Sequence, residues 1–414
     1  MSKKIILILS LLFCGFNFLF AEENQFPFQG FLEYSISGRL PSNDYKPDNL
    51  LINELRGRIE YSKEISNASF DFKFDIIRDE IEKKTEVVAR VANISYFPSN
   101  KWEIKAGRQI LTWGTGDLVF VNDLFPKDWN SFFSGRQDEY LKAPLTAVKT
   151  SFFLDFGNID FVVSPAFESD IYITGERMSY WGPAGLTGQI FKDTEPANKL
   201  KNAEFYFRFS KNISNAEFAL YSFKGFMKRP LGYNQAAQCG FFPKLAVHGL
   251  SVRKQMLGGI AYLETGYYDS IENRKGDNFF IENSMIKSVA GFEKEIKQNL
   301  TAGIQYFSEY TLDYSKYKKN AVNMNMPVLK EHNHDWITLR LTNLNKQQTL
   351  ALSLFGYYSP SENDCYLRPS INYKNSDQLA FAAGFNIFSG KKDYTFFGQL
   401  EDNSNAYFRI SYSY

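Results

Sequence analysis

The sequence predicts an all-β fold: a closed antiparallel transmembrane β-barrel of about 18 strands, with 16 as the alternative count. Three observations lead to this prediction. Apolar and polar residues alternate with a period of two in many short segments. The connections between these segments are alternately short and long. Aromatic residues make up 17% of the chain, yet its mean hydropathy is only −0.33. Barrel strands give this combination because lipid-facing and lumen-facing side chains alternate along them.

Residues 1–21 have the features of a secretory signal peptide, which would leave residues 22–414 as a single barrel domain. Lys3 and Lys4 precede an apolar stretch from Ile5 to Phe20, and Ala21 is an acceptable last residue before cleavage. An uncleaved anchor is the alternative, and Asn17 disfavours it. No later apolar run approaches the roughly 20 residues that a membrane helix needs. The leader therefore indicates export, and the rest of the chain has to cross a membrane with strands.

The charge balance and the cysteines exclude few classes of function. The chain has 47 Lys and Arg against 46 Asp and Glu, so a nucleic-acid partner is not expected. We also expect no cofactor and no metal ion. Cys239 and Cys365 remain after export and form a possible disulfide, because an exported chain meets an oxidising compartment. Two free thiols are equally compatible with the sequence.

The alternating segments show which side chains would face water inside a barrel. In residues 54–61 every second residue is charged, and in residues 68–75 four Phe and Ala positions alternate with polar ones. Charges of both signs cannot line a dry core cheaply, but they can line a wet lumen. The aromatic face then meets the outer-membrane lipids. The charged residues predicted to face the lumen are Glu54, Arg56, Arg58, Glu60, Asp71, Lys73, Asp75, Glu204 and Arg208.

The connections set the topology. Short turns are predicted at residues 63–66, 98–100, 156–158, 211–214, 255–258, 297–299, 345–347 and 375–377. Long polar loops are predicted at residues 41–50, 79–85, 113–145, 168–200, 226–243, 271–284, 311–333, 359–366 and 389–405. Bacterial barrels have short periplasmic turns and longer external loops, so both termini are expected in the periplasm.

The last strand supports closure of the barrel. Phe408, Ile410, Tyr412 and Tyr414 alternate with Arg409, Ser411 and Ser413. A final strand that ends on an aromatic residue resembles the signal read by the outer-membrane assembly machinery, which is therefore an expected partner. An open apolar edge would invite aggregation. We expect this strand to close against the first one, around residues 31–40.

The third external loop, residues 113–145, departs from the regular pattern. Its apolar residues must pack on something, and irregular backbone is tolerated at membrane depth only where it is buried or lines water. We predict that it folds into the lumen; an external lid over the mouth is the alternative. Asp123 or Asn122 is expected to cap a short helix with Pro126 in its first turn. Trp129, Phe132 and Phe133 would share one face of that helix.

Charged residues of this loop, together with Arg108 just before it, are the candidates for a pore constriction: Arg108, Asp117, Asp123, Asp128, Arg136, Glu139 and Lys142. Strict alternation would point Arg108 at lipid, at a cost of about 2–4 kcal/mol at mid-bilayer. A bulge at Gly107 would turn Arg108 inward, where it would pair with Asp117, Asp123 or Asp128. An exposed arginine at the rim is the alternative.

Several motifs resemble a poorly characterised family of Gram-negative outer-membrane barrels, akin to alginate-export-type porins. They are Gly107-Arg108-Gln109; Trp113-Gly114 with Asp117; Asp123, Pro126 and Asp128; Glu139, Lys142 and Pro144; Gly291-Phe292-Glu293; Gln305-Tyr306 with Glu309; Tyr357-Tyr358-Ser359-Pro360; and Phe396-Phe397-Gly398-Gln399 with Asn403-Ser404-Asn405. The resemblance implies a porin-like channel in the outer membrane of a Gram-negative bacterium.

The function expected from these features is passive diffusion of small polar or weakly charged solutes through a pore narrowed by residues 113–145. A plugged barrel acting as a surface adhesin or scaffold is the first alternative, because loops 168–200 and 311–333 are long. An outer-membrane hydrolase is the second, and it would need an activity that is lost on changing His248 or His334; with His332 these are the chain's only histidines. We expect no enzyme. The sequence leaves the solute, the ion selectivity and the oligomeric state open.

Overall fold

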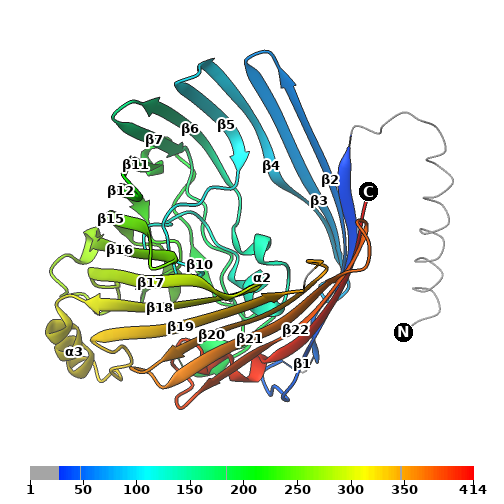
Figure 1. Cartoon of the computed structure of the whole chain (residues 1–414). Helices are drawn as coiled ribbons and strands as arrows, with labels where there is room; N and C mark the ends of the chain where they lie inside the picture. The colour runs from blue at the N-terminus through cyan, green and yellow to red at the C-terminus, as the bar shows by residue number, and fades with distance from the viewer. Residues whose placement is uncertain (1–27, 47, 183, 346) are drawn as a thin grey trace.

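The computed structural model describes residues 28–46, 48–182, 184–345 and 347–414. The predicted signal peptide, residues 1–21, lies outside the described residues. Eighteen antiparallel strands form one closed sheet (Figure 1). In chain order they are β1 (Gln29–Arg39), β2 (Leu50–Ile65), β3 (Ala68–Asp79), β4 (Lys84–Ser99), β5 (Trp102–Gln109), β6 (Leu145–Leu154), β7 (Gly157–Ser164), β11 (Glu204–Ile213), β12 (Ala216–Phe226), β15 (Lys244–Met256), β16 (Gly259–Ser270), β17 (Met285–Lys297), β18 (Leu300–Thr311), β19 (Asn333–Leu344), β20 (Leu350–Ser359), β21 (Asp364–Lys374), β22 (Leu379–Gly390) and β23 (Asn405–Ser413).

The predicted fold class, with 18 strands, is confirmed. Each strand pairs with its neighbours in the chain, and β23 closes the barrel by pairing with β1, for example Tyr34 opposite Ile410. Every predicted short turn overlaps a connection of two to five residues between strands, such as residues 66–67 and 375–378. No described helix has both the length and the apolar character needed to cross a membrane.

The loops carry the remaining elements. The loop between β5 and β6 contains α2 (Trp129–Ser134) and η1 (Asp138–Leu141), and the loop before β19 contains α3 (Tyr314–Asn323). The other short elements are β8 (Tyr180–Gly182), β9 (Gly185–Thr187), β10 (Asp193–Thr194), η2 (Leu200–Asn202), β13 (Gly232–Asn234), β14 (Cys239–Phe241), η3 (Ile271–Asn273) and η4 (Gly398–Asn403). Figure 1 shows α2 within the barrel and α3 at its outer edge.

The two faces of the wall differ as the alternation predicts. Large apolar side chains are exposed on the outward positions of strands all around the barrel. They include Phe72, Ile94, Phe161, Phe205, Leu263, Ile304, Leu339 and Phe408. Such a belt would be unstable in water but matches the hydrocarbon of a bilayer. The polar positions in between face the interior.

The interior is more apolar than the mixed charges suggested. The inward side of the wall carries aromatic residues of β18, β20, β21 and β22, and they pack with α2 into one cluster. Its aromatic members from wall and helix are Phe307, Phe355, Tyr357, Tyr366, Phe388, Phe132 and Phe133. A second cluster joins Phe125 to inward residues of β6, β7, β11, β12, β15, β16 and β17. The barrel is therefore partly filled by a packed core.

Of the two possibilities left open for the cysteines, the structure has the free thiols and not the disulfide. Cys239 and Cys365 are both free and partly buried. Cys239 belongs to β14 in a small loop sheet, where its Sγ lies 3.6 Å from Thr194 Oγ1. Cys365 belongs to the wall strand β21 and pairs across the sheet with Tyr358 and Ser389. Each cysteine is thus held by a different part of the fold.

Candidate functional site

The candidate site is the segment between β5 and β6, residues 110–144, which we call the inward segment. It leaves the wall after Gln109, crosses the interior and returns at Leu145. Along this course it contacts inward side chains of β1, β2, β4, β16, β18, β19, β20, β21 and β23. The predicted inward fold of the third loop is confirmed, and the external-lid alternative is wrong.

The first anchor of the inward segment is Glu264 on β16. Its carboxylate, which is fully buried, accepts hydrogen bonds from Thr115 N at 2.6 Å, Thr115 Oγ1 at 2.9 Å, Gly116 N at 3.3 Å and Asn122 N at 2.6 Å. No salt bridge to this carboxylate is found among the described residues. Four donors replace the water that a buried carboxylate loses, so a turn of the segment is wrapped around one wall residue.

The same turn of the inward segment packs against two glycines of the wall. Gly249 on β15 and Gly266 on β16 are cross-strand partners that face the interior. A Cβ on Gly249 would lie 1.8 Å from Asn122 Oδ1, and one on Gly266 would lie 3.2 Å from the same atom. Asn122 Nδ2 donates to Thr265 O at 3.2 Å, and the Tyr268 hydroxyl donates to Val121 O. Only glycine leaves room for this close approach.

The second anchor joins the segment to β18, β19 and β20, a few strands further along the wall. Asp117 forms an ion pair with Arg340 of β19, with Nη2 to Oδ1 at 2.9 Å. The Gln305 amide of β18 bonds both backbone groups of Asp117, accepting from its N–H at 2.8 Å and donating to its carbonyl at 2.9 Å. The Tyr357 hydroxyl donates to Leu118 O at 2.8 Å. Both side chain and backbone of residues 117–118 are therefore fixed.

The short helix forms where a helix was expected, but its cap differs. Asp128, not Asp123 or Asn122, is the N-cap of α2, and its carboxylate accepts from Ser131 N at 2.8 Å. Asp123 is instead buried in an ion pair with Lys127 at 3.0 Å. The expected shared face is confirmed, because the Trp129 ring lies 6.0 Å from Phe132 and 5.9 Å from Phe133.

The next external loop, residues 165–203, contacts α2 and fixes its position. Asp170 accepts hydrogen bonds from Trp129 Nε1 and from Lys127 N, both at 2.9 Å. The backbones of residues 127–129 also bond to Ile171 on both sides. Burial raises the pKa of the Asp170 carboxyl above its ordinary value, although the nearby Lys127 ammonium opposes this. Two loops thus contribute to the packed interior.

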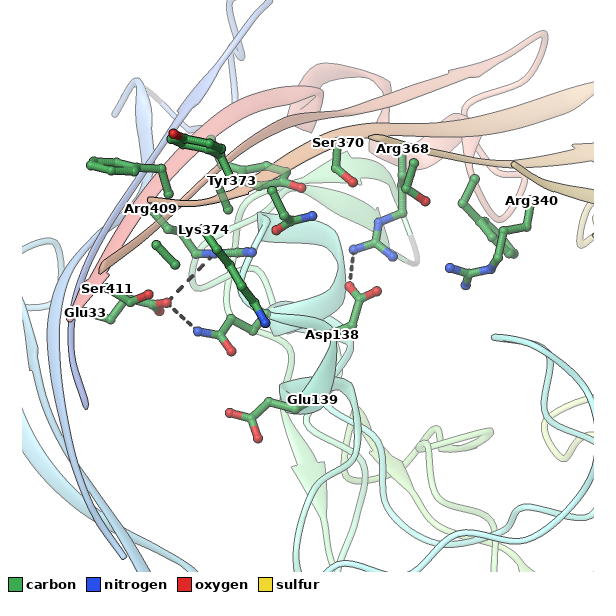
Figure 2. Close-up of a pocket in the computed structure, with 18 residues that line it drawn as sticks. Glu33, Asp138, Glu139, Arg340, Arg368, Ser370, Tyr373, Lys374, Arg409 and Ser411 are labelled. Atoms are coloured by element: carbon green, nitrogen blue, oxygen red, sulfur yellow. Dashed lines mark hydrogen bonds and ion pairs between the residues drawn. The ribbon is translucent and has the colours of Figure 1, made fainter. Parts of the chain in front are cut away.

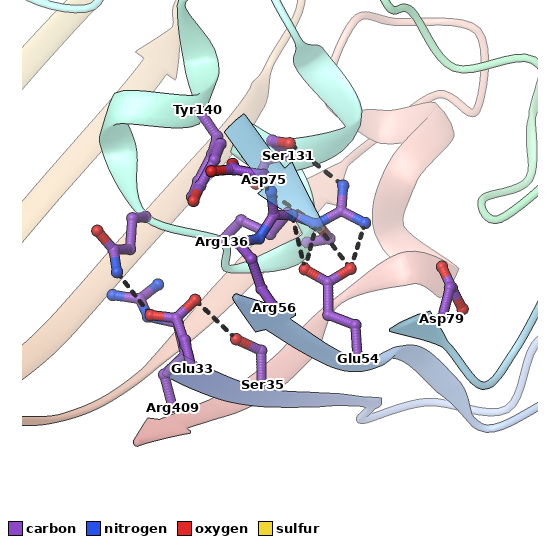
Figure 3. Close-up of polar contacts among 12 residues, drawn as sticks. Glu33, Ser35, Glu54, Arg56, Asp75, Asp79, Ser131, Arg136, Tyr140 and Arg409 are labelled. Atoms are coloured by element: carbon purple, nitrogen blue, oxygen red, sulfur yellow. Dashed lines mark hydrogen bonds and ion pairs between the residues drawn. The ribbon is translucent and has the colours of Figure 1, made fainter. Parts of the chain in front are cut away.

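Arg136 ties the end of the helix to the first strands. Its Nη2 lies 2.8 Å from Glu54 Oε2 and its Nε lies 3.1 Å from Glu54 Oε1, a paired contact visible in Figure 3. Glu54 also accepts from Arg56 at 2.9 Å. Gly135, which ends α2 with a φ of +92°, packs on Tyr407, where a Cβ would come within 2.3 Å of the ring.

Residues 138–140 form the third anchor. Asp138 pairs with Arg368 of β21 at 2.7 Å (Figure 2), and Glu139 pairs with Arg58 of β2 at 2.6 Å. The Tyr140 ring lies under the guanidinium groups of Arg56, Arg90 and Arg58, at 4.1, 4.6 and 5.3 Å from its centroid. Stacking on an aromatic face stabilises cations that are shielded from water.

Arg108 lies elsewhere than predicted. The pairing of β5 with β4 and β6 runs through Gly107 without a bulge, so Arg108 keeps the outward position of its alternation. Its Nη1 lies 2.8 Å from Glu168 Oε2, and its Nε donates to Ala89 O at 2.9 Å. The predicted pairing with Asp117, Asp123 or Asp128 is wrong, because each of these acids has a nearer partner within the segment or on the wall.

The remaining predicted residues divide into two groups. Glu54, Arg56, Arg58 and Asp75 lie on the inward face as predicted but are buried under the segment rather than exposed to water. The residues nearer the short turns are partly exposed; they are Glu60, Asp71 and Lys73. Lys73 pairs with Glu60 at 3.1 Å. Asp71 accepts from Ser62 at 2.6 Å, Arg208 pairs with Glu217, Glu204 pairs with Lys228, and the Lys142 carbonyl accepts from Arg90.

Two cavities remain beside the inward segment, both toward the short turns. The first, of about 400 Å³, lies between residues 137–139 and the inward side of β1 and β19–β23 (Figure 2). The second, of about 650 Å³, lies between residues 110–113 and the inward side of β2–β6. Basic and acidic residues line both: Glu33, Asp138, Glu139, Arg340, Arg368, Lys374 and Arg409 in the first, and Glu60, Asp71, Glu103, Lys73, Lys105 and Lys149 in the second.

Sequence reasoning missed the wall residues that hold the segment. Glu264, Gln305, Arg340, Arg368 and Arg409 all occupy inward positions of late strands. The alternation pattern places each of them on the inward face, and this signal was available. Their partners could not be predicted from this pattern, because Glu264 contacts residues about 140–150 positions earlier in the chain.

The three histidines lie in different surroundings. His248 lies on the outward face of β15 with its Nδ1 3.2 Å from Ser222 Oγ. His332 stacks on Tyr314 in the loop, with the ring centroids 4.7 Å apart, and His334 opens β19 beside Glu362. Among the described residues no group of three or more His, Cys, Asp or Glu side chains is placed to hold a metal ion.

No protein-family model and no curated protein sequence matches the chain. Its structure resembles those of Gram-negative outer-membrane porins. Pseudomonas aeruginosa OccK5 (OpdH) matches with a TM-score of 0.55 at 9% identity, covering 93% of this chain and 97% of that one. Acinetobacter baumannii OccAB3 matches with 0.54 at 9% identity, covering 94% and 98%. Pseudomonas aeruginosa OccD3 (OpdP) matches with 0.53 at 12% identity, covering 94% and 90%.

At these identities the likeness establishes the fold, and the predicted porin fold is confirmed. The closer resemblance to alginate-export-type porins stays a prediction. A closed barrel whose outward side chains form an apolar belt belongs in a bilayer, and barrels of this kind are found in the Gram-negative outer membrane. The chain is therefore an outer-membrane protein with a porin fold.

Proposed function

We propose that the protein is a channel for passive diffusion of small polar or weakly charged solutes, and that the inward segment narrows its passage. The observation that carries this proposal is the course of residues 110–144 across the interior, with two polar cavities left beside them. Acids and bases line both cavities together, so neither a strongly charged nor an apolar solute is favoured.

The anchors of the inward segment support a segment that stays in place, rather than one that moves to open and close the passage. Asp117, Asp138 and Glu139 on the segment are each paired with an arginine of the wall. The acid of each pair is 34–57% exposed, so each pair contributes at most about 1 kcal/mol. Undocking the segment would break several pairs at once, and we expect it to stay docked during transport.

Planar-bilayer recording of the purified protein tests the proposal. A steady ion current is expected, and its complete absence would contradict an open passage. Deleting Leu118–Phe133 should raise the conductance, because α2 and its aromatic cluster leave the interior. Deleting α3, which lies outside the barrel, is the matched control and should leave the conductance unchanged. Equal effects of the two deletions would contradict the narrowing.

A second candidate function is a plugged, non-conducting barrel that acts as a surface adhesin or scaffold. The observation that favours it is the apolar cluster of Val119, Val121, Phe132, Phe133 and Leu141, which also takes in Met178 of the following loop. Liposome swelling separates the two candidates: entry of small sugars supports the channel, whereas liposomes that stay shrunken support the plug.

The proposed partners follow from the membrane and from the last strand. Outer-membrane lipids would cover the apolar belt, and the assembly machinery would read the strand that ends at Tyr414. The experiment is truncation: removing Tyr414 should reduce the amount of folded barrel in the membrane, whereas an equal yield would contradict this role.

A further inference from the structure

An apolar groove lies on the outward face of the wall, where β20, β21 and β22 run side by side (Figure 1). Its volume is about 450 Å³, which is in the range of small-molecule sites. Three consecutive residues of each of these strands line it, and Leu300, Leu341 and Asn343 of β18 and β19 complete the lining. The outward residues among the nine are Leu352, Leu354, Pro369, Ile371, Ala383 and Phe385.

The groove exists because its floor is built from short side chains. Ala383 has Ile371 and Phe408 as its cross-strand partners, and these larger residues are 41% and 43% exposed. Pro369 has no N–H to donate, and the pairing of β21 with β22 is interrupted at residues 368–369. The larger residues of the lining are 36–45% exposed and project beyond this floor; they are Leu352, Leu354 and Phe385. The wall is therefore hollowed at Pro369 and Ala383.

The groove lies in the half of the wall that is nearer the short turns. Leu352 is the third of the 10 residues of β20, which begins after such a turn. Ile371 is the fourth residue from the end of β21, which runs into the next turn. Tyr373 is the next outward residue toward that turn and is 43% exposed. Outward tyrosines mark the level of the lipid headgroups, so the groove begins on the hydrocarbon side of that level.

We propose that this groove is a binding site for one acyl chain of a membrane phospholipid. The groove is continuous with the apolar belt that places the barrel in the bilayer, so hydrocarbon is the medium that contacts it. Among its outward side chains only Asn343 is polar, and it lies next to the turn after β19. Short connections of bacterial barrels face the periplasm, and the periplasmic leaflet of an outer membrane consists of phospholipids.

A second copy of the chain fills the groove less well than an acyl chain does. In a two-fold symmetric contact centred on the groove, the same surface of both copies meets, and one groove lies against the other. The short side chains of Pro369 and Ala383 would then face an empty space, which loses dispersion attraction. An acyl chain is flexible and can follow the floor along its length, so it restores these contacts.

Native mass spectrometry of the full chain in a mild detergent tests the site. The wild-type barrel is expected to carry the mass of one phospholipid. Ala383→Phe fills the groove and should lower the fraction of barrels with a bound phospholipid about tenfold, which is the effect of removing about two methylene groups from the groove. Adding phosphatidylethanolamine to protein stripped of lipid should give the same difference.

Ala106→Phe is the matched control. Ala106 is also an outward alanine of the belt, with Ile94 and Val148 as its cross-strand partners, but it does not line the groove. This variant should retain phospholipid like the wild type. Both variants add an outward phenylalanine such as the wall already has at Phe161 and Phe408, so both should fold normally.

Four results would overturn the site. The first is a stripped wild-type barrel that takes up no phosphatidylethanolamine, and the second is equal binding by all three proteins. The third is a bound glycolipid in place of a phospholipid, which would assign the groove to the other leaflet. The fourth is a dimer mass that disappears only in Ala383→Phe, which would assign the groove to a second copy. None of these measurements requires an open passage, so each result is independent of the channel function.

Discussion

Replacing Glu264 by glutamine tests whether one wall residue holds the inward segment. Its Oε2 accepts three hydrogen bonds, from Thr115 N, Thr115 Oγ1 and Gly116 N, and its Oε1 accepts one from Asn122 N. A glutamine has only one acceptor oxygen, and its NH₂ group would face at least one N–H donor. Either orientation of the amide therefore leaves a buried donor without a partner.

The magnitude follows from this count. One unsatisfied buried donor costs about 1–3 kcal/mol, and the retained bonds lose their charge-assisted part. A total of about 3 kcal/mol would shift the ratio of docked to undocked segment by about 100-fold. The expected result for Glu264→Gln is a noisier current with brief steps to higher conductance, because the turn of residues 115–122 leaves β16 for part of the time while the other anchors hold the rest of the segment.

The matched control is Glu204→Gln. Glu204 is an equally buried wall glutamate, but it pairs with Lys228 in a different loop. It should destabilise that loop and leave the current noise unchanged. Should Glu264→Gln insert normally and conduct with wild-type amplitude and noise, the carboxylate does not hold the segment and the reasoning is refuted.

Three further predictions concern other features. Gly249→Val should raise the conductance in bilayers, because a Cβ there would lie 1.8 Å from Asn122 Oδ1 and would push the inward segment away from the wall. Gly57→Val is the control and should leave the conductance unchanged, because the nearest contact of a Cβ there is at 3.9 Å. Burial, with the nearby Asp364 carboxyl, raises the pKa of Glu362 in an external loop to about 7. The protonated form is thus favoured in the folded state, so this contribution to stability is present at acidic pH and is lost as the pH rises through about 7. Hydrogen exchange in residues 391–404, where Phe396 N donates to Glu362, should be slower at pH 5.5 than at pH 8 after intrinsic correction, and Glu362→Gln should remove the difference. Cys239 and Cys365 should both take up a maleimide in unfolded, unreduced protein; a mass increase of zero labels would mean that a disulfide forms.

The barrel wall could be predicted from the sequence because its signal is local. A residue such as Phe72 or Asp71 reveals its side of the sheet through its immediate neighbours alone. The turns are equally local, and together they determine the number of strands and the closure of β23 on β1. The apolar and aromatic content of residues 118–133 likewise indicated that this stretch packs inside.

The anchors of the inward segment could not be predicted in the same way. Asp117, Asp123 and Asp128 are equivalent acids in the sequence, yet one pairs with Arg340, one with Lys127 and one caps a helix. The choice depends on which wall residues lie opposite in space. Arg108 shows the same limit, since its partner Glu168 belongs to the next external loop.

The sequence by itself therefore determined the cylinder: how many strands it has, which side chains face lipid, and which connection enters the interior. Periodic alternation encodes these properties at every position, whatever the rest of the chain does. Only the tertiary structure decided what fills the interior, because the contacts of Glu264 and Arg136 join residues that are far apart in the chain. The alternation pattern is the same whether an inward residue is acidic or basic. The partner of each charged residue depends on the distances that are set when the barrel closes.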